Sequence, residues 1–384
     1  MSRTSGETRA LRSARALLAL LAPALLASCG GSEADDGPPG AWWAGRGAAV
    51  REVLEQLARL EGTPLARRAR QLALELPECG SVGFHAPNGS AAQLAGGARC
   101  LDAGDPLEQA RRRADRDLVF ALPSAGGGAL RGTLRVEATA LQVDLRWQGA
   151  PTDGALGLFV PGEAPAGPDR LASAGRLLHL RVRPRAGLDL ASLIPAGSQA
   201  DRLFRLRSGI FASAVLDGTW EGAAYLPERA GGMPGVALAL GFSLRSAAVA
   251  AAERFVADLQ ETWPVRTSEL RLAAGDGACL PDLNVLPDLA PCYVATADAL
   301  VVGWNPASLE RALAGAMIAV PDAAGRLDVD FALIQRADDL LARHFAGSER
   351  PLSWPWSRLT ASGGADGDDL VLRFTLVAAP RSAS

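Results

Sequence analysis

Between Leu130 and Gln148 the chain reads LRGTLRVEATALQVDLRWQ. Apolar and polar residues alternate there, first up to Val136 and again from Leu141 to Trp147. A period of two residues places the two kinds of side chain on opposite faces of a strand. The stretch therefore predicts two antiparallel strands, joined by a short turn, with one apolar face and one face in water.

Helical patterns precede these strands. Apolar residues recur at helical spacing over 47–60, which predicts an amphipathic helix. A Thr-Pro pair opens a second predicted helix over 63–76, and an Asp-Pro pair opens a third over 105–115. In each pair the first residue can cap the helix and the proline suits its first turn.

The rest of the chain continues this mixture of strands and helices. We expect strands at 178–183, 236–244, 356–362 and 369–377, a hairpin over 211–226, and helices at 246–262, 305–317 and 330–345.

The fold class predicted from these patterns is α+β, with antiparallel sheets covered by helices. The Pro/Gly/Ala-rich stretch Pro161–Pro168 is the best internal boundary, so we expect two subdomains at 41–160 and 169–384. An offset of 150 residues places Arg176 on Arg326 and superposes several other identical residues. An internal duplication is therefore a further hypothesis.

Composition excludes several classes of protein. The chain has 384 residues, 39 basic and 42 acidic side chains, a net charge of -3 and 48% hydrophobic residues. This composition is typical neither of a disordered protein nor of a basic nucleic-acid binder, so no nucleic-acid partner is expected. Every basic residue is arginine, which excludes chemistry that depends on a lysine amine.

The N-terminal residues resemble a bacterial lipoprotein signal. Arginines precede the apolar run Leu17–Leu26, which is long enough for a signal peptide and too short to span a bilayer. The run ends in Leu-Ala-Ser-Cys, which resembles the lipobox of bacterial lipoproteins. The resemblance implies cleavage of a signal peptide at 1–28, attachment of lipid to Cys29, and a flexible spacer over 29–40. The alternative is an ordinary secretory peptide to which Cys29 is incidental.

The same resemblance indicates a location. Gly30, rather than Asp, follows the cysteine. In the lipoprotein family this implies onward transport to the outer membrane, with the attached lipid holding the chain to the bilayer. The expected location is therefore the outer membrane, on its periplasmic or surface face.

The remaining cysteines fit an exported chain. Apart from Cys29 there are four, and an even number in such a chain predicts disulfides. Three connectivities are open, and the spacing favours Cys79 with Cys100 and Cys279 with Cys292. A metal site is the alternative, but cysteine and histidine spacings typical of zinc ligands are absent from the sequence.

A second resemblance covers the segment Cys292–Ala316. Its predicted strand, turn, strand and capped helix resemble a unit repeated in uncharacterised exported and lipoprotein families of bacteria. The resemblance supports an architecture and implies no catalytic residues.

No motif predicts catalysis. The sequence contains no G-x-S-x-G, H-E-x-x-H or EF-hand pattern. We expect its three histidines to be solvated or hydrogen-bonded structural residues: His85 in a loop, His179 on the polar face of a strand beside arginines, and His344 near a helix end. The acidic groups at 35–36, 338–339 and 366–369 are expected on the solvated surface of a spacer, a helix and a turn. No catalytic residue, metal site or cofactor is therefore predicted.

These observations favour a non-enzymatic binding or scaffold module anchored in the envelope. A protein partner or a hydrophobic ligand is its expected second contact, besides the membrane. One alternative is a carrier or chaperone for a hydrophobic ligand such as a lipid, and a second is an envelope hydrolase. A carrier would show a large pocket lined by the apolar face of 236–244 or its neighbours, together with co-purified lipid. A scaffold would lack both and show a broad exposed apolar patch instead, and a hydrolase would need a histidine within hydrogen-bond reach of a serine or carboxylate in a cleft.

Overall fold

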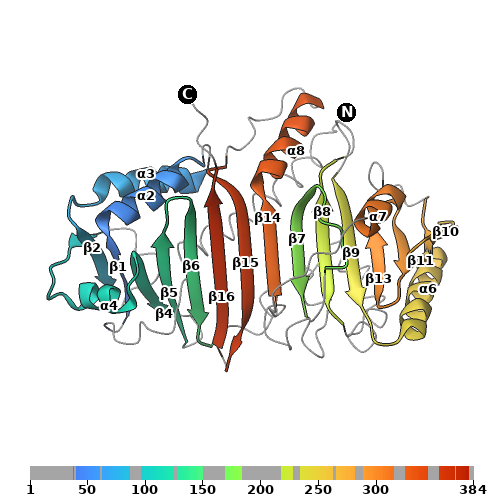
Figure 1. Cartoon of the computed structure of the whole chain (residues 1–384), viewed down its shortest axis with the longest axis horizontal. Coiled ribbons are helices and arrows are strands. Elements are labelled where there is room, and N and C mark those ends of the chain that lie inside the picture. The colour runs from blue at the N-terminus through green and yellow to red at the C-terminus, as the bar shows by residue number, and fades with distance from the viewer. Residues whose placement is uncertain are drawn as a thin grey trace. The chain divides into compact units, whose positions relative to one another are not determined.

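The chain folds as a mixed α+β protein that is mostly antiparallel sheet (Figure 1). The structure is a computed structural model. It describes residues 38, 40–60, 63–86, 97–123, 128–149, 169–183, 218–227, 234–262, 265–281, 289–314, 325–344, 354–367 and 369–379. The predicted α+β class with antiparallel sheet is confirmed. The boundaries at 160 and 169, and the internal duplication, stay predictions.

The described residues cluster into two compact units. The first holds the elements up to residue 149 together with the last strand of the chain, and the second holds the elements between them.

The sheet of the first unit has the strand order β3-β2-β1-β4-β5-β6-β16. All neighbouring pairs are antiparallel. Its strands are β1 (Ala41–Arg46), β2 (Ser81–Ala86), β3 (Arg99–Cys100), β4 (Leu118–Pro123), β5 (Ala129–Val136), β6 (Ala140–Trp147) and β16 (Asp369–Ala378). The hairpin predicted from the alternation at 130–148 is β5 and β6.

The three predicted helices of this unit are confirmed as α2 (Gly47–Ala58), α3 (Pro64–Glu75) and α4 (Pro106–Ala114). Side-chain caps begin two of them, because Thr63 accepts from the N–H of Ala66 and Asp105 accepts from the N–H of Leu107. Helix α4 packs on β1 and β4, where Trp42 is 1% exposed.

The sheet of the second unit has the order β10-β11-β12-β13-β9-β8-β7-β14-β15. Its strands are β7 (Arg176–Val182), β8 (Trp220–Tyr225), β9 (Gly235–Gly241), β10 (Ser268–Leu272), β11 (Gly275–Cys279), β12 (Cys292–Ala295), β13 (Ala299–Gly303), β14 (Gly325–Asp330) and β15 (Trp356–Asp366). The predicted strand at 236–244 is shorter, since it ends at Gly241. Of the predicted hairpin over 211–226, the second strand is β8, and the first lies outside the described residues.

Helices α6 (Arg245–Thr262) and α7 (Pro306–Leu313) pack on opposite faces of this sheet. Helix α7 contacts Ala239 and Val301, whereas α6 contacts their chain neighbours Leu240 and Leu300. Successive residues of a strand point to opposite faces, so the two helices cover different faces. We refer to these as the α7 face and the α6 face.

The last helix, α8 (Phe331–His344), follows β14 without a break (Figure 1). The predicted helices at 246–262, 305–317 and 330–345 correspond to α6, α7 and α8. Within the described part of the chain, no helix is long and apolar enough to cross a membrane.

Both favoured cysteine pairs form disulfides. Cys79, in the turn before β2, is bonded to Cys100 in β3, with their Cα atoms 5.9 Å apart. Cys279 of β11 is bonded to Cys292, the residue directly opposite it on β12. Each bond therefore fastens strands near one edge of its sheet.

Candidate functional site: a buried polar cluster

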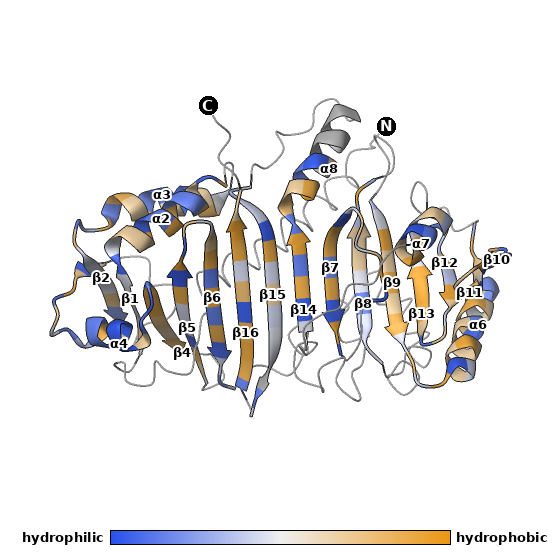
Figure 2. Ribbon diagram, viewed as in Figure 1, coloured by the Kyte–Doolittle hydropathy of each residue, from blue (hydrophilic) through white to orange (hydrophobic). Residues whose placement is uncertain are grey.

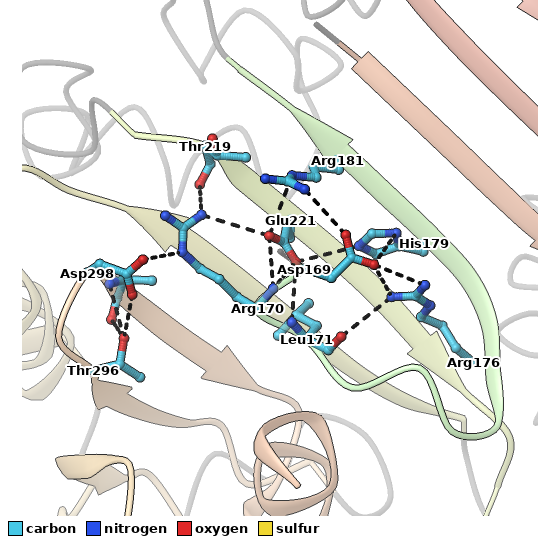
Figure 3. A network of polar contacts seen from close by, with 11 residues as sticks. Asp169, Arg170, Leu171, Arg176, His179, Arg181, Thr219, Glu221, Thr296 and Asp298 are labelled. Carbon is cyan, nitrogen blue, oxygen red and sulfur yellow. Dashed lines mark hydrogen bonds and ion pairs between the residues drawn. The ribbon is translucent and has the colours of Figure 1, made fainter. Parts of the chain in front are cut away.

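The most unusual group of side chains lies on the α7 face of the second unit (Figure 3). A four-residue segment, Asp169–Ala172, runs over β7 and β8 and meets charged residues from both strands. We call this segment the strap. Together with Arg176, His179, Arg181 and Glu221 it forms what we call the polar cluster.

Glu221 holds the strap to β8. Its carboxylate accepts hydrogen bonds from the backbone N–H groups of Arg170, at 2.9 Å, and Leu171, at 3.3 Å. The side chain is 0% exposed. Burial raises the pKa of Glu221, but contacts with His179, the N–H of Arg170 and the charge of Arg181 outweigh it, so the net pKa is lowered.

Asp169 holds the strap to β7. One carboxylate oxygen lies 3.2 Å from Nη1 of Arg176, and the other lies 3.5 Å from Nη1 of Arg181. Register places Arg181 opposite Glu221, so both carboxylates share this arginine. The strap therefore adds a carboxylate to a sheet face that already carries buried arginine.

His179 lies between the two carboxylates. Its Nδ1 is 3.8 Å from Asp169, and its Nε2 is 3.6 Å from Glu221. Neither nitrogen has a hydrogen-bond partner among the described residues, and the side chain is 0% exposed. His179 is therefore not solvated, because the polar face of β7 is the buried one, and its expected structural role stays a prediction.

Tyr225 secures the far end of the strap. Its hydroxyl donates to the carbonyl of Ala172 at 3.0 Å, and the N–H of Ala172 donates to the carbonyl of Ala312 in α7. Burial raises the pKa of Tyr225 to about 12, so the hydroxyl stays protonated and able to donate. The guanidinium of Arg311 lies over the tyrosine ring, 5.4 Å from its centroid.

Arg170 covers the cluster on its solvent side. Its guanidinium lies 3.8 Å from Glu221 and donates to Asp298 at 2.8 Å. Asp298 is exposed, whereas Asp169, His179, Arg181 and Glu221 are all buried. The cluster is thus a closed group of charges rather than an open site.

Three residues of the polar cluster have possible ligand atoms close enough together to hold a metal ion. Asp169, His179 and Glu221 each offer one ligand atom, and these atoms lie within 4.8 Å of one another. The charges do not fit a divalent cation, however. Arg176 and Arg181 already balance the two carboxylates, so a bound divalent ion would add two uncompensated positive charges to a buried group. We therefore interpret the polar cluster as a structural ion network.

The residues considered from the sequence, where the structure describes them, fall on different elements. His85 is a half-buried residue of β2 opposite Trp42, not a loop residue as expected. His344 is the last residue of α8, and positions 338–339 lie on the same helix. Asp366 and Asp369 flank the turn between β15 and β16, where both pair with Arg146. Cys29 and the acidic pair at 35–36 lie outside the described residues.

Sequence reasoning missed the polar cluster, although two signals were present. Glu221 is a lone charge in the otherwise uncharged strand WEGAAY. His179 and Arg181 follow one face of a neighbouring strand. A charge isolated within an apolar strand needs a partner if it is buried, and the adjacent charged face could have supplied one.

Comparisons with known proteins leave the family open. No family model, no curated protein and no solved structure matches this chain.

Proposed function

We propose that the chain is an exported protein of the bacterial envelope, anchored in the outer membrane through lipid on Cys29, and that it acts as a non-enzymatic binding or scaffold module. The observation that carries this proposal is the pair of disulfides. Stable disulfides are typical of compartments outside the reducing cytosol. They leave Cys29, in its lipobox-like sequence, as the one cysteine of the chain outside these bonds.

The closed polar cluster supports a non-enzymatic role. His179 lies near two carboxylates, and a histidine beside a carboxylate is the arrangement a hydrolase would need. Its complete burial leaves no path by which a substrate could contact the ring. Balanced charges that fix the strap explain the cluster without chemistry.

A carrier or chaperone for a hydrophobic ligand is the alternative function. Leu238 lies within the segment 236–244 and is 46% exposed on β9, which fits the exposed apolar surface of a scaffold as well as a carrier. An envelope hydrolase remains a second alternative, and no geometry in the described residues favours it.

The proposal is tested by labelling the full chain in a diderm bacterium with an alkyne analogue of palmitate. The wild-type chain should incorporate the label and fractionate with outer membranes. Cys29→Ser should abolish both, whereas Ser28→Ala, which keeps a small residue before the cysteine, should preserve both. Label that persists in Cys29→Ser, or wild-type chain that stays in the soluble fraction, would contradict the anchor.

The sorting step is tested separately at Gly30. Gly30→Asp should retain the labelled chain in the inner membrane, and Gly30→Ala should not. Equal distribution of these two variants would refute outer-membrane sorting while leaving the lipid anchor intact.

A further inference from the structure

Strand β10 forms one edge of the sheet of the second unit (Figure 1). It pairs with β11 on one side, and on its other side no strand among the described residues pairs with it. An edge strand presents a row of backbone N–H and C=O groups to which another strand can bind. The side chains of Glu269 and Arg271 on β10 are 83% and 79% exposed, so solvent reaches the face that carries them.

Charges distinguish β10 from the inner strands of this sheet. Its sequence is SELRL, whereas β9 (GVALALG) and β13 (ALVVG) carry no charged residue. Figure 2 shows the hydrophobic colour of those two inner strands. Glu269 and Arg271 lie on one face of β10 and form an ion pair at 3.1 Å. An exposed pair of this kind contributes little to stability, so both charges can exchange it for another partner.

The charges of β10 are complementary to those of a second copy of the same strand. In an antiparallel pair related by a two-fold axis at Leu270, Glu269 of each copy lies opposite Arg271 of the other. An axis at residue 269 or at residue 271 would instead place like charges opposite each other, which is destabilising. The charges of the edge therefore select one register.

Both faces of such a pair continue the faces of the sheet. On the α6 face, Asp276 of β11 lies opposite Arg271, so Arg271 would lie between Asp276 and the second copy of Glu269. On the α7 face, Leu270 and Leu272 are half-buried and pack against the hydrophobic core. The two copies of Leu270 would meet at the axis and extend that core.

We propose that β10 is a homodimerisation edge, at which two copies of the chain pair antiparallel about Leu270. The five residues of the strand extend over about 17 Å. A contact of this length is smaller than a standard protein–protein interface, so the dimer is weak in dilute solution. A second copy is favoured over an extended segment of another protein because it brings the matching charges with it.

The test traps the weak dimer through a disulfide at the axis. Leu270→Cys is introduced into the full chain with Cys29→Ser, and the purified protein is oxidised with copper phenanthroline. Opposite residues of antiparallel strands have Cα atoms about 4.5–5.5 Å apart, which suits a disulfide, so a covalent dimer is expected on a non-reducing gel. Leu272→Cys is the matched control on the same face. Its two copies would lie about 14 Å apart, so this variant should stay monomeric.

Reversal of charge tests the register. In the Leu270→Cys chain, Glu269→Arg should slow formation of the covalent dimer about tenfold, because two attractive pairs in each dimer become repulsive. Glu269→Arg together with Arg271→Glu should restore the rate, since the two strands are then complementary again. Both side chains are exposed, so these changes should alter stability little, which urea unfolding checks.

Three results would overturn the proposal. The first is a Leu270→Cys chain that stays monomeric, whether another segment covers the edge or none does. The second is equal cross-linking of Leu270→Cys and Leu272→Cys. The third is a rate that Glu269→Arg leaves unchanged or that the double exchange does not restore. None of these results bears on whether Cys29 is lipidated, so this inference and the proposed function fail separately.

Discussion

Replacing Glu221 by glutamine keeps the shape of the side chain and removes its charge. In the wild-type chain this carboxylate accepts two backbone N–H groups of the strap and faces His179 and Arg181. The substitution removes one of the two negative charges beside Arg181, so the positive charge of this 3% exposed side chain is less well balanced. It also turns one acceptor oxygen into an N–H₂ group that cannot accept from the strap.

The expected loss is large because the group is buried. Breaking a buried ion pair by removing one partner costs about 3–5 kcal/mol, since the remaining charge cannot be solvated. Asp298 provides the contrast, because it pairs with Arg170 from the same strap but is 61% exposed. Exposed pairs contribute at most about 1 kcal/mol, so Asp298→Asn should change stability little.

Urea unfolding followed by tryptophan fluorescence measures both variants, with Trp220 on β8 next to the substituted position. The difference in free energy of unfolding between wild type and Glu221→Gln should shrink on acidification. Because the pKa of Glu221 is lowered in the folded chain, its carboxylate stabilises the fold at pH values above the ordinary pKa of a glutamate. This stabilisation is lost as the pH falls through the lowered pKa. If Glu221→Gln destabilises the chain no more than Asp298→Asn, the polar cluster does not hold the fold together as argued.

Three further perturbations test other parts of the structure. Replacing Cys279 and Cys292 together by alanine should cost about 3 kcal/mol, because their bond closes a loop over 13 positions, and calorimetry of both forms measures it. Tyr225→Phe should cost about 1 kcal/mol in urea unfolding, since the carbonyl of Ala172 loses its donor, and an unchanged midpoint would argue against that bond. Burial raises the pKa of Glu108, but hydrogen bonds from two arginines of its own helix outweigh the effect of burial and lower the pKa to about 2. It should therefore stabilise the fold fully above its ordinary pKa of 4.5 and progressively less as the pH falls towards 2, so that Glu108→Gln flattens the acid limb of a stability profile.

Local patterns predicted much of the fold. Alternation identified the hairpin of β5 and β6, and capping residues marked the starts of three helices at Thr63, Asp105 and Asn305. The disulfide pairing followed from cysteine spacing. Each of these signals acts within about twenty residues, so a single sequence is enough to display it.

Patterns that depend on tertiary contacts were missed or misinterpreted. The sequence of β1, AWWAGR, has no alternation, because most of its residues are buried on both faces. On β7 the alternation was visible, but it does not say which face is covered. His179 and Arg181 became buried because the strap, which comes before β7 in the chain, brings Asp169 over them.

Mass spectrometry of the mature chain, isolated from its membrane without reduction, tests the lipid anchor and the disulfides together. We expect an N-terminal peptide that begins at an acylated Cys29, together with peptides joined through Cys79–Cys100 and Cys279–Cys292. A chain that retains residues 1–28 without acyl mass and yields free thiols at those four positions would contradict this expectation.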